Sequence, residues 1–145
     1  MDSIAGSLNL GKTILLVEDD PADVFIFKRA LARANIVNPV IIVTDGQEAV
    51  DYLSNNGKYS DHEKHPLPFV IFLDLKLPYL DGFEVLTWIR QQPPLQSIVV
   101  IVLTGSDETR DHQRANTLGA RSYLVKPPEP EDIRQLMESM AGDLG

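Results

Sequence analysis

Apolar residues along this chain gather into five short runs, and the segments between the runs repeat their apolar residues every three or four positions. Short uninterrupted apolar runs are typical of strands buried on both faces, whereas the wider spacing is typical of helices with one buried face. Strands that alternate with helices indicate parallel βαβ units, so we expect an α/β fold with one parallel, doubly wound sheet. The predicted strands are Thr13–Val17, Val40–Val43, Phe69–Leu73, Ile98–Leu103 and Ser122–Val125.

The first and last predicted helices have the clearest signals. Asp20 is a favourable N-cap residue, and Pro21 follows it at the first helical position, where proline is well tolerated. The last helix has a stripe spaced i, i+3, i+4, i+7, which predicts one buried face. That stripe consists of Ile133, Leu136, Met137 and Met140.

The helix expected between Asp107 and Leu118 is the least apolar of the five. Ser106 is a suitable N-cap, yet only Ala115 and Leu118 are apolar in this segment. Since burial stabilises by about 25 cal/mol per Å² of apolar surface, we expect this helix to be weakly anchored. Weakly anchored elements are where switching motions occur, but a peripheral, well-solvated helix has the same pattern. The sequence leaves both interpretations open.

Composition excludes several classes of function. The 145 residues carry a net charge of −8, which argues against nucleic-acid binding because that requires a basic face. Cysteine is absent, so disulfides, thiolate metal sites and cysteine nucleophiles are excluded. Apolar runs fall well short of the ~20 residues of a membrane span, and the segment Met1–Ala5 has none of the features of a secretory signal. We expect a cytoplasmic protein that binds neither nucleic acid nor membranes.

Charged residues follow three of the predicted strands directly. Glu18 and Asp19 follow the first strand, Asp74 follows the third and Lys126 follows the fifth. Open α/β sheets place their ligand chemistry at the carboxyl ends of the strands, so these side chains should meet in one crevice. Three converging carboxylates repel one another, and a hard divalent cation such as Mg²⁺, with its oxygen ligands, relieves that repulsion. The pattern predicts a metal-assisted phosphoryl-acceptor site.

Over residues 12–142 the chain resembles the receiver domain of two-component response regulators. Each motif is short, but the set in this order and spacing is highly specific. The resemblance implies a flavodoxin-like, five-stranded parallel sheet in the order 2-1-3-4-5, flanked by five helices. The motifs that carry it are Glu18-Asp19-Asp20, Asp74 with Pro78 and Gly82 behind it, Thr104, and Lys126-Pro127.

The resemblance also implies a role for each residue of the site. Asp74 would accept a phosphoryl group from the phosphohistidine of a sensor histidine kinase, in a Mg²⁺-dependent reaction. Asp19, Asp74 and the backbone carbonyl of Lys76 would bind Mg²⁺ directly, and Glu18 would act through water. Lys126 would pair with Asp74 at rest and with a phosphoryl oxygen after transfer. We expect no other cofactor.

Two further residues are expected to read out the phosphorylation. Thr104 would bond to the phosphoryl group and draw the following loop inward, although its hydroxyl could instead satisfy a local backbone group. Tyr123 occupies the position of an aromatic residue that swaps between outward and inward rotamers in this family. A tyrosine on a half-buried edge strand needs no such role. The Lys126-Pro127 peptide resembles one that is cis in the family.

We predict an N-terminal tail over residues 1–11, one receiver domain over residues 12–142, and no output domain. Residues 56–68 form a polar connection longer than the usual 2–6 residues, so they are interpreted as an extended loop insertion. This loop and the lack of an output domain resemble the small stand-alone regulators paired with cyanobacterial and bacterial phytochromes. The expected function is therefore a switch of partner binding, in phytochrome-type light signalling.

Two other functions were weighed against this one. An aspartate-nucleophile phosphatase also uses a strand-end aspartate with Mg²⁺, but it places a second acid two residues on, where this chain has Lys76. A receiver-like module that binds partners without phosphorylation would not need the complete set of Asp19, Asp74, Thr104 and Lys126. We therefore expect no enzyme activity beyond the domain's own phosphorylation and its slow self-dephosphorylation.

The resemblance also suggests an assembly. Receivers commonly dimerise or bind targets through the face of the fourth helix, fifth strand and fifth helix. Mixed charge on these two helices suits a polar, self-complementary homodimer, though it equally describes a solvated surface. Tyr123 would supply apolar contact. The charged residues are Glu108, Arg110, Asp111 and Arg114 on one helix and Glu131, Asp132 and Arg134 on the other.

Overall fold

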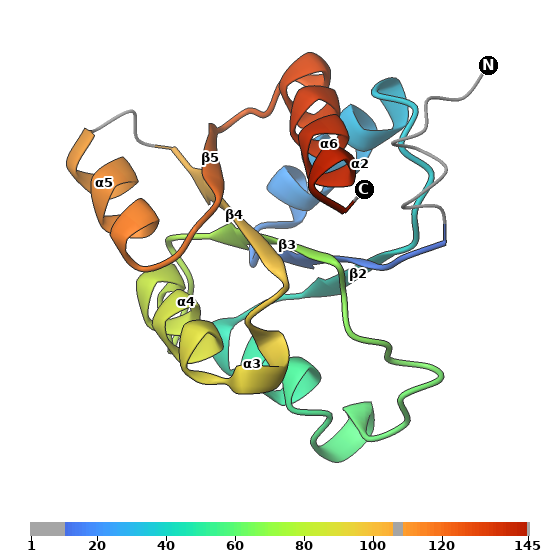
Figure 1. The fold of residues 1–145 in the computed structure, drawn as a ribbon, viewed down its shortest axis with the longest axis vertical. Helices are drawn as coiled ribbons and strands as arrows, with labels where there is room; N and C mark the ends of the chain where they lie inside the picture. Colours follow the sequence, from blue (N-terminus) through green and yellow to red (C-terminus); the bar gives the residue numbers. More distant parts are fainter. Residues whose placement is uncertain (1–10, 106–108, 145) are drawn as a thin grey trace.

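A computed structural model of the protein describes residues 11–105 and 109–144 (Figure 1). The strands are β1 (Ile14–Val17), β2 (Val40–Val43), β3 (Val70–Asp74), β4 (Val99–Thr104) and β5 (Ser122–Val125). The α-helices are α2 (Pro21–Arg33), α3 (Gly46–Leu53), α4 (Gly82–Gln91), α5 (Thr109–Thr117) and α6 (Pro130–Leu144). Two short 3₁₀ turns, η1 (Gly57–Tyr59) and η2 (Pro93–Leu95), precede β3 and β4.

The five strands form one sheet in the order β2-β1-β3-β4-β5, and the paired strands run parallel. The predicted fold class and strand order are confirmed. β3 and β4 each lie one residue later than predicted, because the ladder continues through Asp74, which pairs with Leu103, and through Thr104, which pairs with Val125. Both side chains are therefore held by the last rungs of the sheet rather than by loops.

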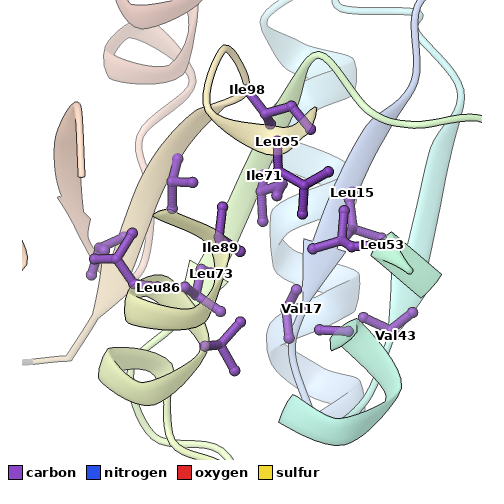
Figure 2. Packing of buried hydrophobic residues seen from close by; sticks show 14 of the residues in the cluster. Leu15, Val17, Val43, Leu53, Ile71, Leu73, Leu86, Ile89, Leu95 and Ile98 are labelled. Carbon is purple, nitrogen blue, oxygen red and sulfur yellow. The ribbon is translucent and has the colours of Figure 1, made fainter. Parts of the chain in front are cut away.

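Two apolar cores lie on opposite faces of the sheet, because successive side chains of a strand point to opposite sides. Ile71 and Leu73 of β3 belong to the core beneath α3, α4 and α5, whereas Val70 and Phe72 belong to the core beneath α2 and α6. Figure 2 shows the first of these cores, where Leu86 and Ile89 of α4 meet the sheet. Every residue of β3 is buried, which accounts for its uninterrupted apolar sequence.

Helix starts follow the capping residues in the sequence. Asp20 caps α2 as predicted, since its side chain accepts a hydrogen bond from the amide of Ala22 at 2.9 Å. Asp81 and Glu84 form a capping box at the start of α4. The predicted cap Ser106 and the predicted first helical residue Asp107 lie outside the described residues.

The segment 56–68 is mostly exposed, but a few of its residues anchor it to the rest of the fold. The rings of Tyr52, Tyr59 and His65 meet edge to face, with centroids 5.0–6.0 Å apart. The Tyr52 hydroxyl donates to the carbonyl of Pro66 at 2.8 Å, and the Asn55 amide donates to the carbonyls of Tyr59 and His65. These contacts fix the predicted insertion against the end of α3.

α5 is the weakly buried helix that the sequence predicts, with Ala115 as its one buried residue. Polar side chains hold it instead. The guanidinium of Arg114 lies over the ring of Phe83, 4.0 Å from its centroid, and Arg90 donates two hydrogen bonds to the carbonyl of Gly119. Within the described residues, no helix combines the length and the apolar character needed to cross a membrane.

Candidate functional site

The carboxyl ends of β1 and β3 bring three acids together. Glu18 and Asp74 are buried, at 1% and 4% exposure, while Asp19 is exposed to solvent. One carboxylate oxygen from each of the three lies within 4.8 Å of the others. The three acids therefore converge as the sequence predicts, with one of them open to solvent.

Asp74 is held on both of its oxygens. Oδ1 accepts a hydrogen bond from the amide of Lys76 at 3.0 Å, and Oδ2 accepts one from Nζ of Lys126 at 2.9 Å. Gly82 allows the following loop to fold back, because its amide donates to the carbonyl of Leu75 at 2.9 Å and a Cβ there would meet the Asp74 carbonyl. The carbonyl of Lys76 remains a predicted metal ligand.

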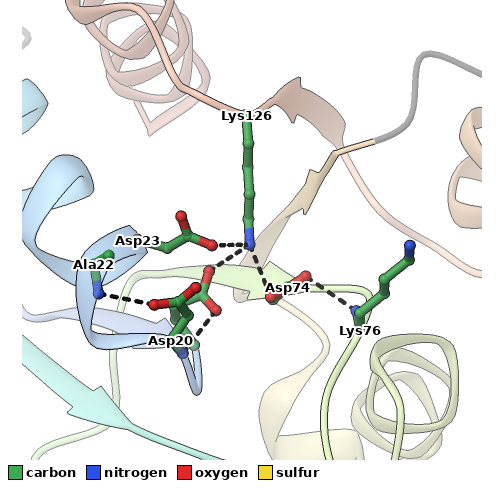
Figure 3. Close-up of polar contacts among 7 residues, drawn as sticks. Asp20, Ala22, Asp23, Asp74, Lys76 and Lys126 are labelled. Atoms are coloured by element: carbon green, nitrogen blue, oxygen red, sulfur yellow. Dashed lines mark hydrogen bonds and ion pairs between the residues drawn. The ribbon is translucent and has the colours of Figure 1, made fainter.

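Lys126 reaches from the end of β5 into the centre of the site (Figure 3). Its Nζ lies 2.9 Å from Asp74, 2.6 Å from Glu18 and 3.0 Å from Asp23. Burial alone would lower the pKa of Lys126, but the three carboxylates outweigh burial and raise it above its ordinary value. The ammonium group therefore stays charged and faces the predicted acceptor, as expected for a resting receiver.

Glu18 has one oxygen whose bonding is incomplete. Oε2 accepts a hydrogen bond from the amide of Asp20 at 3.2 Å. Oε1 lies 2.6 Å from Nζ of Lys126 as an ion pair, yet it is buried and accepts no hydrogen bond of regular geometry. Burial and the neighbouring Asp74 raise the pKa of Glu18 to about 7, although the contact with Lys126 lowers it.

These observations fit a divalent cation. A buried carboxylate oxygen lacking a regular hydrogen bond, beside two more carboxylates, offers the all-oxygen ligand set that hard divalent cations take. A bound cation would also relieve the repulsion that holds the pKa of Glu18 high. The acidic group of Glu18, Asp19 and Asp74 is therefore suited to divalent metal binding.

Thr104 and Tyr123 lie on the neighbouring strands β4 and β5. Thr104 is buried, and its carbonyl accepts a hydrogen bond from the amide of Lys126 at 2.8 Å. Tyr123 is 42% exposed, and its ring stacks on that of His112 in α5, with centroids 3.4 Å apart. The switch role of Tyr123 stays a prediction. The Lys126-Pro127 peptide is cis, as predicted.

The sequence analysis missed two residues that touch the site. Asp23 binds Lys126 across 103 positions of sequence, and His112 covers the ring of Tyr123. Asp23 lies in the first turn of α2, and nothing in its local sequence points to Lys126. Nothing in the spacing of His112 points to Tyr123.

Comparison with known proteins identifies this class of fold and site. The family described as the response regulator receiver domain matches residues 14–138. The chain belongs to this family, whose members are signalling proteins.

Similarity to a known response regulator extends over nearly the whole chain. Response regulator Rcp1 from Synechocystis is 38% identical over 132 residues, which cover 91% of this chain and 88% of Rcp1. The Mn²⁺-bound structure of Rcp1 has a TM-score of 0.72 and covers 89% of this chain and 91% of that one.

Two further structures come from light-responsive systems. The phosphorylated cyanobacterial phytochrome response regulator RcpA is 36% identical, with a TM-score of 0.74. Response regulator RPA3017, from red light signalling in R. palustris, is 32% identical, with a TM-score of 0.78. Each match covers 89% of this chain and 90% of the other.

Proposed function

We propose that this protein is a phosphorylation-controlled switch in which Asp74 accepts a phosphoryl group from the phosphohistidine of a sensor histidine kinase. The observation that carries the proposal is the geometry around Asp74. Its carboxylate lies 2.9 Å from the Lys126 ammonium and within the acidic group suited to a divalent cation. Phosphoryl transfer depends mainly on such positioning and charge neutralisation.

In this reaction a carboxylate oxygen of Asp74 attacks phosphorus in line with the leaving imidazole. The new P–O bond forms as the P–N bond breaks, and the bonding pair returns to the imidazole nitrogen. Lys126 would neutralise charge on the phosphoryl oxygens, and the hydroxyl of Thr104 would donate a hydrogen bond to one of them. Mg²⁺, held by Asp19, Asp74 and the Lys76 carbonyl with Glu18 through water, would supply further charge neutralisation when bound.

The resulting acyl phosphate hydrolyses when water attacks phosphorus, so the domain would slowly reset itself without another catalyst. A phosphatase is less well supported, because the position two residues after Asp74 holds Lys76, whose amide donates to that carboxylate. The chain offers no second acid at this position to protonate a leaving group. The proposed chemistry is thus confined to the domain's own aspartate.

Incubation with Mg²⁺ and a small phosphodonor such as acetyl phosphate tests this assignment. Wild type should acquire an acid-stable, hydroxylamine-labile phosphate, and Asp74→Asn should acquire none, because the amide is not a nucleophile. Asp81→Asn is the matched control: it also removes one carboxylate, but asparagine caps a helix as well as aspartate. Undiminished labelling of Asp74→Asn would refute the proposal.

We further propose that the kinase belongs to phytochrome-type light signalling and that the protein acts in the cytoplasm without binding nucleic acid. Similarity to RcpA and RPA3017 supports the first part, and the net charge of −8 supports the last. Transfer from a phosphorylated bacteriophytochrome kinase, measured at short times beside an unrelated sensor kinase, tests the pairing. Equal rates from both donors would argue against it.

We propose a homodimer through the face formed by α5, β5 and α6, which phosphorylation would strengthen. Tyr123 offers apolar surface at the centre of this face, and charges of both signs surround it. Glu131 and Arg134 already pair within α6, so they would act at the rim, and Glu108 lies outside the described residues. Sedimentation at tens of micromolar tests the proposal, and a monomer in both phosphorylation states would refute it.

A further inference from the structure

Asp23 differs from the other two carboxylates that contact Lys126. Its Oδ2 accepts a hydrogen bond from Nζ at 3.0 Å, and its side chain is 34% exposed, compared with 2% for Glu18 and 6% for Asp74. Among the described residues, the acidic group able to hold a metal consists of Glu18, Asp19 and Asp74. Asp23 is therefore a partner of Lys126 that a bound cation does not need as a ligand.

A bound divalent cation would compete with Lys126 for the negative charge of the same carboxylates. Glu18 and Asp74 each contact Nζ within 3 Å, and both belong to the acidic group. The cation and the ammonium also repel each other across this short distance. Lys126 must therefore give up part of its contact with these two carboxylates when the metal binds, while still facing the acceptor.

We propose that Asp23 is a positioning residue that retains Lys126 beside Asp74 when the metal is bound. Lysine carries three N–H donors, so it can keep one on Asp23 while the others turn from carboxylate to phosphoryl oxygen. Asp23 sits in the first turn of α2, whose buried face fixes the position of its carboxylate. The inference rests on the proposed metal-dependent acceptor site, and it adds a residue of α2 to that site (Figure 3).

The alternative is that Asp23 only ties α2 to the end of β5. A tie of that kind would change the stability of the fold without changing how strongly the metal binds. The two roles differ in whether Asp23 acts on the metal through Lys126. A double-mutant cycle on Mg²⁺ affinity, measured by calorimetry on the unphosphorylated protein, separates them.

Asp23→Asn should weaken Mg²⁺ binding about fivefold in the wild-type background. Without Asp23, Lys126 pairs more strongly with Glu18 and Asp74 and so competes better with the cation. In the Lys126→Met background the same substitution should have little effect, since the competing ammonium is gone. Asp20→Asn is the matched control: it removes one charge from the same end of α2, and asparagine preserves the cap. Its effect should be smaller and equal in both backgrounds.

An effect of Asp23→Asn that is the same in both backgrounds, or no larger than that of Asp20→Asn, would overturn the inference. Asp23→Glu restores a carboxylate and should recover most of the affinity if Asp23 acts through Lys126; failure to recover would count against it. Thermal unfolding of each variant shows that it is folded under the conditions of the titration. If Asp74 is phosphorylated normally but Asp23 and Lys126 show no coupling in Mg²⁺ affinity, only the inference about Asp23 is overturned. If the wild-type protein acquires no phosphate, the proposed function itself is overturned.

Discussion

α4 and α5 lie on the same face of the sheet, yet they are held there by different forces. α4 begins with a capping box and buries Val85, Leu86 and Ile89 against the strands. Among its described residues, α5 buries only Ala115. It is otherwise held by Arg114, whose guanidinium lies over the ring of Phe83, and by Arg90 of α4, which donates to the carbonyl of Gly119. Figure 1 shows α5 beyond the edge strand β5, further from the centre of the sheet than α4.

This difference separates the two tasks of the proposed switch. α4 supports the loop that follows Asp74, so apolar packing fixes the place where a phosphoryl group would be attached. α5 follows Thr104 and covers Tyr123 through His112, so polar and ring contacts hold the part that would respond. Polar and ring contacts near the surface can be exchanged at low cost in free energy, whereas a packed apolar core resists partial movement.

The largest expected effect comes from breaking the anchor of α4. Leu86→Ala should lower the free energy of unfolding by about 2–5 kcal/mol, because it leaves a cavity in the core. Leu118→Ala, just beyond α5, removes the same atoms from a half-buried site and should cost less than half as much. Chemical denaturation of both variants measures the contrast, and equal losses would show that α5 is as firmly packed as α4.

The second largest effect should be the stabilisation of the folded protein by Mg²⁺ bound at the acidic group beside Asp74. At 100 times its dissociation constant, a ligand that binds the folded state adds about 2.7 kcal/mol to the free energy of unfolding. Because the acids that repel one another lie in the site, we expect this gain with Mg²⁺ and not with equal ionic strength from KCl. Thermal unfolding at pH 8 measures it, with Asp74→Asn as a variant that should gain less.

The pKa of Glu18 makes this gain depend on pH. Since burial raises that pKa from 4.5 to about 7, the contribution of Glu18 to the metal-free fold is complete below pH 4.5 and lost as pH rises through 7. Mg²⁺ favours the ionised carboxylate, so its affinity should fall up to tenfold per unit as pH drops below about 7. Titrations from pH 6 to 8 test this, and Glu18→Gln should flatten the curve.

A fourth prediction separates phosphorylation of Asp74 from the response to it. Thr104→Ala leaves Asp74 and the acidic group intact, so labelling by a phosphodonor should persist. The phosphorylation-dependent change in dimer or partner affinity should fall about tenfold, because a hydrogen bond to a charged group contributes about 1.5–3 kcal/mol and tenfold lies at the lower end of that range. Lys126→Met should act in the same direction. Thr104→Ser keeps the hydroxyl and serves as the control, and full response from Thr104→Ala would reject this route.

The smallest effect should come from the polar anchor of α5. Arg114→Met removes the cation–π contact with Phe83, which contributes about 0.5–1 kcal/mol at an exposed site. Amide exchange within α5 should quicken about two- to fivefold, while exchange in α4 and the global midpoint of unfolding stay near wild type. Arg110→Met, on the same helix, is the control. Unchanged exchange in α5 would show that this contact does not hold the helix.

Local sequence signals predicted most of the fold and most of the site. Apolar runs located the strands to within one residue, and strand-end charges located Asp74 and Lys126, because parallel strands gather their carboxyl ends at one edge. The sparse apolar pattern correctly marked α5 as weakly buried. The structure brings the charged residues of the site together, but the roles assigned to the site residues remain predictions: Glu18, Asp19, Asp74, the Lys76 carbonyl, Thr104, Tyr123 and Lys126.

Contacts between distant segments were the part that sequence could not supply. Asp23 looked like an ordinary acid in the first turn of a helix, where the dipole favours negative charge in any case. Its contact with Lys126 depends on how α2 and β5 meet across the sheet. Likewise, nothing in the sequence indicated that Tyr52 of α3 would pack against the rings of Tyr59 and His65 in the polar segment that follows.

The anchored segment 56–68 after α3 has a consequence for recognition. The Tyr52 hydroxyl donates to the carbonyl of Pro66, and the rings of Tyr52, Tyr59 and His65 pack together, so the exposed residues between Tyr59 and His65 are anchored at both ends. A protein that bound this surface would therefore lose less loop entropy than one that bound an unanchored loop. The segment is therefore suited to act as a recognition surface that is separate from the residues expected to respond to phosphorylation.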